Sequence, residues 1–498
     1  MKNLWLRRVN DADSDLLFEW INDPDTRRNS LNSAPIMRKE HDAWFERRKA
    51  DSSCHHYMVM EGANAVGVVR LDGIEDSEGE YRVSINIAPE ERGRGYGHEA
   101  LLLLNNQACA EIPDAQILHA EIKISNTASK KSFEKAGYRL ILTTGGDDPV
   151  SYLERSVDHS QMVYFRCDAN SQIGSGHLMR CLTIADACRD KDVTPVFIMA
   201  QDDMEQVVRE RGYVCTVLGT EYDKMHLEIP KLVTCVPDGA VVVIDSYQIG
   251  DSYIKGLAAH DYRIFLMNDG GDIRKDVDCL INYNISADKK EYPTSEMRCL
   301  IGPSYAPVRP SFCDFPFGVT ESIRDILITT GASDPYHISL LLLQGLLQHS
   351  KNLQIQVICG KFCEDEELLL AAQKAYGGRV SVITGATDLS AYMRKADFVF
   401  AGSGSTVYEL MAIGAPAAVF SFADNQLPIA EAYDTYFPGL NLGDIRKDAF
   451  LVTERAIQTL ENLSTPFVRQ DMSRRMQQIV DGGGAGRIAD AIRDVVNS

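Results

Sequence analysis

The stretch FRCDANSQIGSGHLMRCLTIADAC, residues 165–188, joins the end of an apolar strand to a glycine-rich turn and then to a helical pattern. The strand pattern ends near Asp168, and the helix is predicted to begin around His177. A strand, a turn and a helix in this order form the building unit of parallel, doubly wound sheets. Residues 165–188 therefore predict an α/β fold, and they place an imidazole near the positive end of a helix.

The same rhythm recurs along the rest of the chain. The apolar segments PVFIMA, AVVVID, RIFLMN and CLINYN continue the first series, and DILITT, QIQVICG, VSVITG, DFVFAG and AAVFSF form a second one. Between the two series the chain carries four prolines: Pro303, Pro307, Pro310 and Pro316. We expect two Rossmann-like lobes, 162–310 and 321–498, the second with C-terminal helices, and a ligand cleft between them.

The first 157 residues follow a different pattern. The amphipathic helical stretch 13–22 precedes the alternating strands HYMVME, AVGVVRL and RVSINIA, which predict a mixed sheet. A polar stretch, 158–161, separates this part from the apolar strand MVYFR. The predicted fold class is therefore α/β, with an N-terminal mixed-sheet domain over 1–157 followed by the two Rossmann-like lobes.

Composition bounds the kinds of partner. The chain has 51 Lys and Arg against 71 Asp and Glu, a formal charge of −20, which argues against nucleic acid as a general partner. Phosphate groups can still bind at helix N-termini through backbone amides. The 12 cysteines form no C-x-x-C pair, so no metal site is expected, and reduced thiols indicate a cytoplasmic location. No signal peptide or membrane-length apolar run is found, so no membrane association is expected, whereas a homo-oligomer is left open.

A first candidate site lies at a strand-to-helix junction of the N-terminal domain. Arg92, Gly95 and Gly97 form the pattern R-x-x-G-x-G directly after the strand SINIA. Glycines let the backbone approach a ligand closely, and the N-terminus of the following helix offers unpaired amides to a diphosphate. Glycine turns before helices are common, so the pattern alone leaves a purely structural role open.

Further segments match one family in order. Together with EIKISNTASKKSFEKAGYRLI at 121–141, this turn resembles the cofactor-binding motifs of the GNAT acetyltransferases, and the resemblance covers nearly all of 1–157. The segment WINDPDTRR at 20–28 is similar to the ribosomal-protein acetyltransferase branch. The resemblance implies acetyl-CoA as co-substrate and direct transfer of the acetyl group from the thioester to an amine. It implies cofactor contacts at Ile85, Ile87, Arg92, Gly93, Arg94, Gly95, Tyr96, Gly97 and Asn126.

Proton transfer in this domain stays unassigned. Many members of the family carry a tyrosine, which protonates the leaving thiolate, where this chain has Phe133. A phenyl ring cannot donate a proton, so Tyr138 or a water is left for that role. His55, His56 and Glu121 are candidate bases, and each of them fits a structural role better.

The second candidate site is His177. The turn before it, QIGSGH, is not the dinucleotide-binding pattern, because position 179 is a methionine. The positive helix end disfavours protonation, so a neutral imidazole can accept a proton from water near pH 7. A lone histidine is often structural, but the flanking glycines favour one that faces a ligand.

The segment RCDANSQIGSGHLMR resembles the nucleotide-sugar hydrolase of the pseudaminic acid pathway, which shares the GT-B fold of the MurG-like glycosyltransferases. Other segments match in order: IDSY (244–247), NDGGD (268–272), INYN (281–284), GPSYAPVRPSF (302–312), TTGASDP (329–335) and AGSGSTVYEL (401–410). The resemblance implies a GT-B-like pair of lobes, His177 as the base that activates water at the anomeric carbon, Glu409 on the ribose of UDP, and no metal. It implies substrate contacts at Gly174, Ser175, Gly176, Arg180, Asp245, Asn284, Tyr305, Arg309, Gly331, Ser333, Ser403, Ser405, Glu409, Asn425 and Gln426.

The two resemblances together imply consecutive steps on one nucleotide sugar: N-acetylation of a UDP-4-amino sugar, and release of UDP from the resulting diacetamido-trideoxy sugar. One alternative keeps both folds but places them in a related surface or spore-coat polysaccharide pathway, on another UDP-sugar. Another is GT-B glycosyl transfer to an alcohol. A third is a nucleotide-sugar-binding or scaffold protein with degenerate sites.

Overall fold

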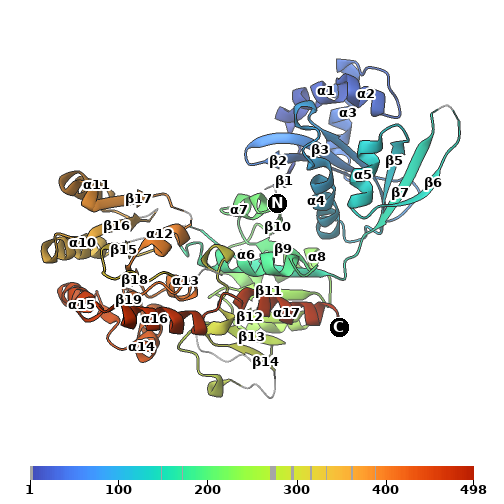
Figure 1. The fold of residues 1–498 in the computed structure, drawn as a ribbon. Coiled ribbons are helices and arrows are strands. Elements are labelled where there is room, and N and C mark those ends of the chain that lie inside the picture. The colour runs from blue at the N-terminus through green and yellow to red at the C-terminus, as the bar shows by residue number, and fades with distance from the viewer. Residues whose placement is uncertain are drawn as a thin grey trace.

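The computed structural model describes residues 4–146, 148–170, 172–269, 276–292, 297–313, 317–331, 334–360, 363–386 and 388–498. Three sheets follow one another along the chain, each covered by helices (Figure 1). Two of them are built only from parallel pairs, and the N-terminal one is mixed. The predicted fold class, a mixed-sheet domain followed by two Rossmann-like lobes, is confirmed.

The N-terminal sheet has the order β1-β2-β3-β4-β5-β7-β6, in which only β4 and β5 are parallel. Its strands are β1 (Leu4–Arg8), β2 (Cys54–Glu61), β3 (Asn64–Gly73), β4 (Glu80–Ile87), β5 (Ile117–Lys123), β6 (Arg139–Thr143) and β7 (Val150–Ser156). Its helices are α1 (Ser14–Asn22), α2 (Pro24–Asn29), α3 (Arg38–Ala50), α4 (Tyr96–Glu111) and α5 (Thr127–Lys135).

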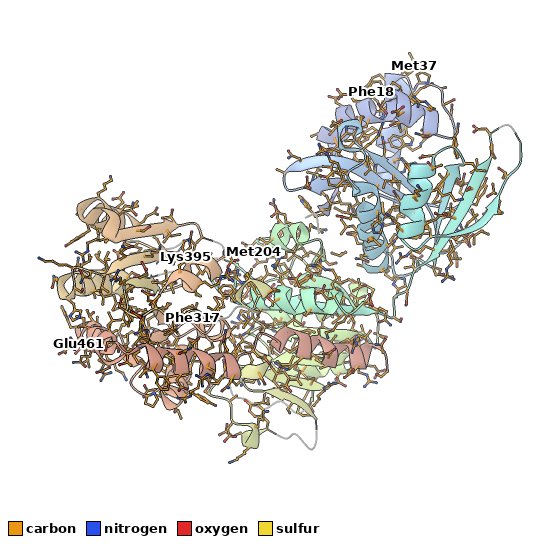
Figure 2. All side chains as sticks on the ribbon, viewed as in Figure 1. Phe18, Met37, Met204, Phe317, Lys395 and Glu461 are labelled. Carbon is orange, nitrogen blue, oxygen red and sulfur yellow. The ribbon has the colours of Figure 1, made fainter. Side chains whose placement is uncertain are left out.

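The alternation of β1 shows how this sheet is covered on both faces. Leu4 and Leu6 belong to the buried cluster that includes Leu101 of α4, whereas Trp5 belongs to the cluster of α1 and α3. Successive side chains of a strand point to opposite faces, so the two clusters lie on opposite sides of the sheet. On the side of α1 and α3, Phe18 and Met37 are labelled at the end of the domain away from the two lobes (Figure 2).

The first lobe has the strand order β10-β9-β8-β11-β12-β13-β14. Its strands are β8 (Met162–Cys167), β9 (Thr194–Met199), β10 (Val214–Val217), β11 (Val241–Asp245), β12 (Arg263–Met267), β13 (Cys279–Asn282) and β14 (Arg298–Ile301). Its helices are α6 (Gly176–Arg189), α7 (Glu205–Glu210), α8 (Ile229–Cys235) and α9 (Asp251–Ala258). The chain builds the sheet outward in one direction from β8 and in the other from β11, so the topological switch point lies between these two strands.

The second lobe repeats the plan with the order β17-β16-β15-β18-β19-β20. Its strands are β15 (Asp325–Thr329), β16 (Gln354–Cys359), β17 (Val380–Thr384), β18 (Phe398–Gly402), β19 (Ala417–Ser421) and β20 (Asn441–Asp444). Its helices are α10 (Ile338–His349), α11 (Glu366–Tyr376), α12 (Ser390–Lys395), α13 (Thr406–Ile413), α14 (Leu427–Tyr436), α15 (Ala449–Asn462) and α16 (Pro466–Ile479). Here the switch point lies between β15 and β18.

The last helix, α17 (Gly484–Val496), returns to the first lobe and lies against α6 (Figure 1). Its first residue, Gly484, touches the backbone at the end of the first lobe so closely that a Cβ there would lie 2.2 Å from the carbonyl oxygen of Ala306. Lys191 pairs with Asp490 at 2.6 Å. The sequence-based boundary had grouped this helix with the second lobe. Its packing corrects that boundary, because its apolar face is buried against the first lobe.

The three parts are in contact. Ala110, near the end of α4, belongs to the same buried cluster as Met162 and Tyr164 of β8, so the N-terminal domain is docked on the first lobe. A single buried cluster runs from Phe165 in the first lobe to Phe400 in the second. Between the two lobes the chain crosses over near Phe317, which is labelled in Figure 2.

Candidate active sites

The start of α4 forms the first candidate site. Gly93 and Gly95 have φ angles of 77° and 86°, and a Cβ at either residue would meet nothing within 4 Å. The left-handed backbone, rather than lack of room, therefore explains why both residues are glycine. Gly93, Arg94 and Gly95 are exposed, so the unpaired amides at the beginning of this 16-residue helix are open to a ligand.

Next to this turn, β4 and β5 separate. Their parallel pairing covers only Glu80–Arg82 against Ile117–His119, although β4 continues to Ile87. Ile85 and Ile87 lie on this continuation and are paired on their other side with β3. Among the described residues, the edge of β4 that faces β5 therefore has no ladder partner beyond Arg82, and an extended ligand with amide groups can pair with it.

Arg92 is bound within the domain. Its Nη2 lies 2.7 Å from Asp23 Oδ2 and 2.8 Å from Thr26 Oγ1, and its Nε donates to the carbonyl oxygen of Ile87 at 3.3 Å. Burial alone raises the pKa of Asp23, but the Thr26 amide and Arg92 outweigh burial and lower it. The arginine of the glycine motif therefore ties the start of α2 to the start of α4.

The glycine turn at 93–97 and the open edge of β4 beside it together form what we call the glycine cradle. Other predicted cofactor residues build the framework around it. The hydroxyl of Tyr96, a buried residue, donates to Glu61 Oε2 at 2.6 Å. Asn126 caps α5, because its Oδ1 accepts the Ser129 amide at 3.1 Å. Arg94 pairs with Glu91 at 2.7 Å, and a Cβ on Gly97 would lie 3.3 Å from Ser132 Oγ, where α4 approaches α5.

A cavity of about 60 Å³ lies between the sheet and α1 and α3. Its lining residues are Leu17, Ile21, His41, Trp44, His56, Val68, Val69, Arg70, Ser84, Ile85 and Asn86. Because Ile85 belongs both to the cavity and to the open edge of β4, a ligand arm on that strand would end at this cavity. Sequence reasoning missed Trp44 and His41, which have no motif spacing.

Of the acid and base candidates, His56 alone lines this cavity. Burial, and then Arg70, lower its pKa to about 3, so its imidazole is neutral near pH 7 and accepts hydrogen bonds. Glu121 pairs with Arg82 at 2.9 Å. Tyr138 is buried and its hydroxyl donates to Asn105 Oδ1 at 2.8 Å, so Tyr138 is not placed to protonate a thiolate.

His177 forms the second candidate site, at the switch point of the first lobe. It is the second residue of α6, and its side chain is 8% exposed. Its Nδ1 lies 2.7 Å from Oδ1 of Asp245, the last residue of β11. When Nδ1–H donates to this carboxylate, Nε2 carries the lone pair and can accept a proton.

Arg180, one turn further along α6, holds the same carboxylate. Its Nε and Nη2 donate to Asp245, and its Nη1 donates to Asp269 Oδ2 at 2.7 Å and to the Tyr283 hydroxyl at 2.8 Å. Burial raises the pKa of Asp245, but Arg180 and His177 outweigh it and hold the pKa at about 2. Arg180 was expected to bind substrate. Its guanidinium is instead committed to this buried network, where it orients Asp245.

Tyr247 covers the imidazole. The two rings meet edge to face with centroids 4.5 Å apart, and the Tyr247 hydroxyl donates to Asp269 Oδ2 at 3.1 Å. Sequence reasoning gave no role to Tyr247 or Asp269, although both lie in segments that carried the resemblance. The glycine turn before His177 is open to solvent, because Ser175 and Gly176 are exposed. Gly174 in this turn has a φ of 71°, in the left-handed region that favours glycine.

The second lobe contributes glycine turns at its own switch point. Gly331, with a φ of 91°, follows β15, and the exposed Ser405 precedes α13. Ser403 is a correction: it is completely buried, its amide and hydroxyl donate to the Phe420 carbonyl, and its hydroxyl also contacts Ser421 at 2.8 Å. Its side chain therefore bonds to the neighbouring strand β19 and does not face a ligand.

Several predicted substrate residues are paired with one another or with the backbone. Glu409 accepts a hydrogen bond from Arg309 Nη2 at 2.8 Å; burial raises the pKa of Glu409, against the effect of Arg309. Gln426 accepts the Phe422 amide at 2.9 Å, and Asn425 next to it is exposed. Tyr305 lies in the turn under α17. Ser333 and residues 270–272 of the NDGGD segment lie outside the described residues.

Metal ions and membranes are two further kinds of partner. Among the described residues, no group of three or more His, Cys, Asp or Glu is arranged to hold a metal ion. In the same part of the chain, no helix has the length and apolar character needed to cross a membrane.

Curated proteins include sequence relatives of this chain. An uncharacterized protein of Methanocaldococcus jannaschii is 24% identical over 304 residues, which cover 58% of this chain and 61% of that protein. The spore coat polysaccharide biosynthesis protein SpsG of Bacillus subtilis is 22% identical over 282 residues, 54% of this chain and 73% of SpsG. The chain thus spans less than two thirds of the length of the archaeal relative.

Solved acetyltransferase structures are similar to part of this chain. A spermidine N-acetyltransferase from Vibrio cholerae, solved with CoA and spermine, is 16% identical and covers 32% of this chain and 97% of its own, with a TM-score of 0.29. The aminoglycoside acetyltransferase AAC(6')-Ib, solved with coenzyme A, is 19% identical and covers 31% and 94%, with a TM-score of 0.28. Residues 3–139 match the family model described as an acetyltransferase (GNAT) domain. The chain therefore begins with a GNAT acetyltransferase domain.

Proposed function

We propose that the chain is a bifunctional nucleotide-sugar enzyme, which acetylates an amine on a UDP-sugar and then releases UDP from the acetylated product. The observation that carries the second activity is the His177–Asp245 pair at the switch point of the first lobe. A GNAT domain with an intact glycine cradle, docked on that lobe, supports the first activity.

For acetyl transfer, the residues fit acetyl-CoA as co-substrate. The amides after Gly93 and Gly95 would hold its diphosphate, and the open edge of β4 at Ile85 and Ile87 would pair with its pantetheine arm. Acetyl-CoA supplies the acetyl group as a thioester. The cavity beside Ile85 would hold the amine, with Trp44 as an apolar wall and neutral His56 as a hydrogen-bond acceptor for an amine proton.

For hydrolysis, His177 Nε2 would take a proton from a water molecule as the water oxygen bonds to the anomeric carbon. The bond between that carbon and the diphosphate oxygen breaks, and UDP leaves with its electron pair. Asp245 stabilises the imidazolium that forms, because its carboxylate accepts the Nδ1–H. Amides after β15 and before α13 would hold the diphosphate, and Glu409 would bind the ribose after parting from Arg309.

The proposed identity of the UDP-sugar substrate rests on the similarity to SpsG and on the two sites taken together. The similarity to SpsG supports a pathway that makes a surface polysaccharide or a related sugar. A UDP-4-amino-trideoxy sugar, which the first site acetylates and the second releases as the free diacetamido sugar, would place the chain in pseudaminic acid biosynthesis. Another UDP-sugar in a spore-coat or surface-polysaccharide pathway is the alternative.

The test is mass spectrometry of products after incubation of the full chain with acetyl-CoA and a UDP-4-amino-trideoxy sugar. We expect the UDP-linked acetylated sugar first, and then UDP and the free reducing sugar without any added acceptor. If UDP appears only when an alcohol acceptor is added, the lobes are a glycosyltransferase. If neither UDP nor an acetylated product forms from any UDP-amino sugar, the proposed function is wrong.

A further inference from the structure

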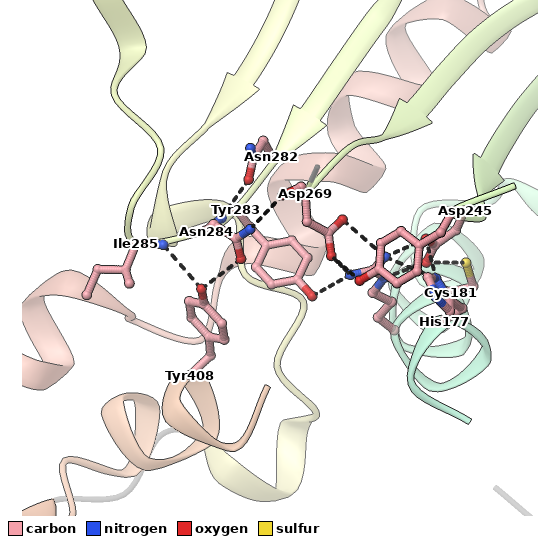
Figure 3. Close-up of polar contacts among 11 residues, drawn as sticks. His177, Cys181, Asp245, Asp269, Asn282, Tyr283, Asn284, Ile285 and Tyr408 are labelled. Carbon is pink, nitrogen blue, oxygen red and sulfur yellow. Dashed lines mark hydrogen bonds and ion pairs between the residues drawn. The ribbon is translucent and has the colours of Figure 1, made fainter. Parts of the chain in front are cut away.

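Tyr408 crosses from the second lobe into the first. It lies on α13 and is buried, with 3% of its surface exposed. Its hydroxyl accepts the Ile285 amide at 3.2 Å and donates to Asn284 Oδ1 at 3.0 Å (Figure 3). Its ring meets Tyr283 edge to face, with centroids 5.2 Å apart. The Tyr408 side chain therefore joins the second lobe to the polar network of the first.

The direction of these bonds is determined by their partners. Because the Tyr408 hydroxyl accepts the Ile285 amide, its proton is directed to Asn284 Oδ1. The Asn284 amide group is thereby oriented, and its Nδ2 donates to the carbonyl oxygen of Asp269 at 3.5 Å. The carboxylate of the same Asp269 accepts from Arg180 at 2.7 Å.

The chain of contacts ends on the imidazole. Arg180 Nη2 lies 3.1 Å from His177 Nδ1 and holds Asp245, which is the partner of that nitrogen. Five residues thus link α13 to His177, all of them half-buried or buried, and the step from Asn284 to Asp269 runs through the backbone carbonyl of Asp269. A second arm runs through the rings, from Tyr408 to Tyr283, whose hydroxyl also accepts from Arg180 at 2.8 Å.

The position of α13 gives this link its meaning. The same helix carries Glu409 and begins just after Ser405, the residues expected to face the nucleotide. A buried hydrogen-bond network has discrete arrangements rather than a continuum, because leaving any member unpaired is costly. A shift in the position of α13 would therefore alter the position of Arg180 and the orientation of the His177 imidazole.

We propose that Tyr408 is a positioning residue: through Asn284, Asp269 and Arg180 it couples the seating of the nucleotide-binding helix α13 to the alignment of His177. The proposal rests on the proposed hydrolase function of this site. Nucleotide bound on α13 would hold the helix in place, and the imidazole would then be aligned toward the water. Hydrolysis would be tied in this way to a correctly seated nucleotide.

The test compares Tyr408→Phe with Tyr433→Phe. We call the linked residues Tyr408, Asn284, Asp269, Arg180 and Asp245 the relay. Tyr433 is also buried in the second lobe and donates a hydrogen bond from its hydroxyl to the Ala417 carbonyl at 3.0 Å, but it does not contact the relay. Both variants lose one buried hydroxyl, and Tyr408→Phe also leaves the Ile285 amide without its acceptor, so it should lose at least as much thermal stability as Tyr433→Phe. Tyr408→Phe keeps the ring contact with Tyr283 and removes the hydrogen bonds of the hydroxyl. We expect its single-turnover hydrolysis rate to fall about 3- to 30-fold, with KM and UDP affinity almost unchanged.

A double-mutant cycle sharpens the comparison. Asn284→Ala removes the next member of the relay, so adding Tyr408→Phe to it should slow hydrolysis little further. If the two effects multiply, the residues act independently and the relay is wrong. Equal hydrolysis rates for Tyr408→Phe and Tyr433→Phe would also overturn the proposal, as would a raised KM with an unchanged rate.

A readout without turnover separates this proposal from the proposed function. In the chain labelled with ¹³C at histidine Cε1, the signal lost in His177→Gln identifies His177 among 11 histidines. Tyr408→Phe should shift that signal, and Tyr433→Phe should leave it in place. If the wild-type chain hydrolyses no UDP-sugar, the proposed function fails, yet this spectrum still decides the relay: an unmoved His177 signal in Tyr408→Phe overturns it.

Discussion

At the scale of single residues, the second site depends on which partners each charged group finds. His177 and Asp245 meet at 2.7 Å although 68 positions separate them, and Arg180 holds the same carboxylate. Replacing His177 with Ala should cut UDP release by roughly 10²–10⁴-fold, the usual contribution of a positioned general base. UDP affinity and acetyl transfer should stay normal, so the UDP-linked acetylated sugar should accumulate, as measured by chromatography of a time course. A full rate of UDP release in this variant would contradict the role of His177.

Asp245 gives the same site a dependence on pH. Its pKa of about 2 lies below the ordinary aspartate value of about 3.9. The ionised carboxylate therefore contributes stability that is complete above about pH 5 and is lost as the pH falls through the folded pKa near 2, in total about 2–3 kcal/mol. Urea unfolding of the wild-type chain should show this loss across that range. Asp245→Asn should be less stable at pH 7, because Arg180 loses its partner, and should show a flatter dependence between pH 4 and 2.

At the scale of elements, the glycine turn before α4 and the separation of β4 from β5 form one cradle. Gly95→Glu should weaken acetyl-CoA binding roughly 10- to 100-fold, because a carboxylate at the helix start repels a diphosphate. Gly95→Ala is the matched control: it imposes the same strain at a φ of 86° without the charge. Calorimetry should find the alanine variant much closer to wild type. Equal affinities for the two variants would mean that backbone strain, and not charge, decides binding at this turn.

At the scale of the whole molecule, α17 closes the chain back onto the first lobe. Gly484→Ala should destabilise the protein by about 1–3 kcal/mol, because its Cβ would lie 2.2 Å from the Ala306 carbonyl oxygen. Gly486→Ala, two residues on in the same helix, has nothing within 4 Å and should be neutral or stabilising by up to about 1 kcal/mol. Calorimetric unfolding of both variants checks this. An unchanged melting temperature in Gly484→Ala would mean that α17 shifts freely on the lobe.

The main strands of the two lobes, the three-part α/β architecture and the glycine turns before α4 and α6 could be predicted from the amino-acid sequence, because short-range periodicity and backbone preferences encode them. Tertiary structure alone decided which side chains meet there. Tyr247 joins His177 only because β8 and β11 are neighbours at the switch point, and Asp269 joins them because β12 pairs with β11. Ser403 turns inward because the end of β18 pairs with β19. Pairings of this kind depend on strand order and on lobe docking, which no local pattern encodes.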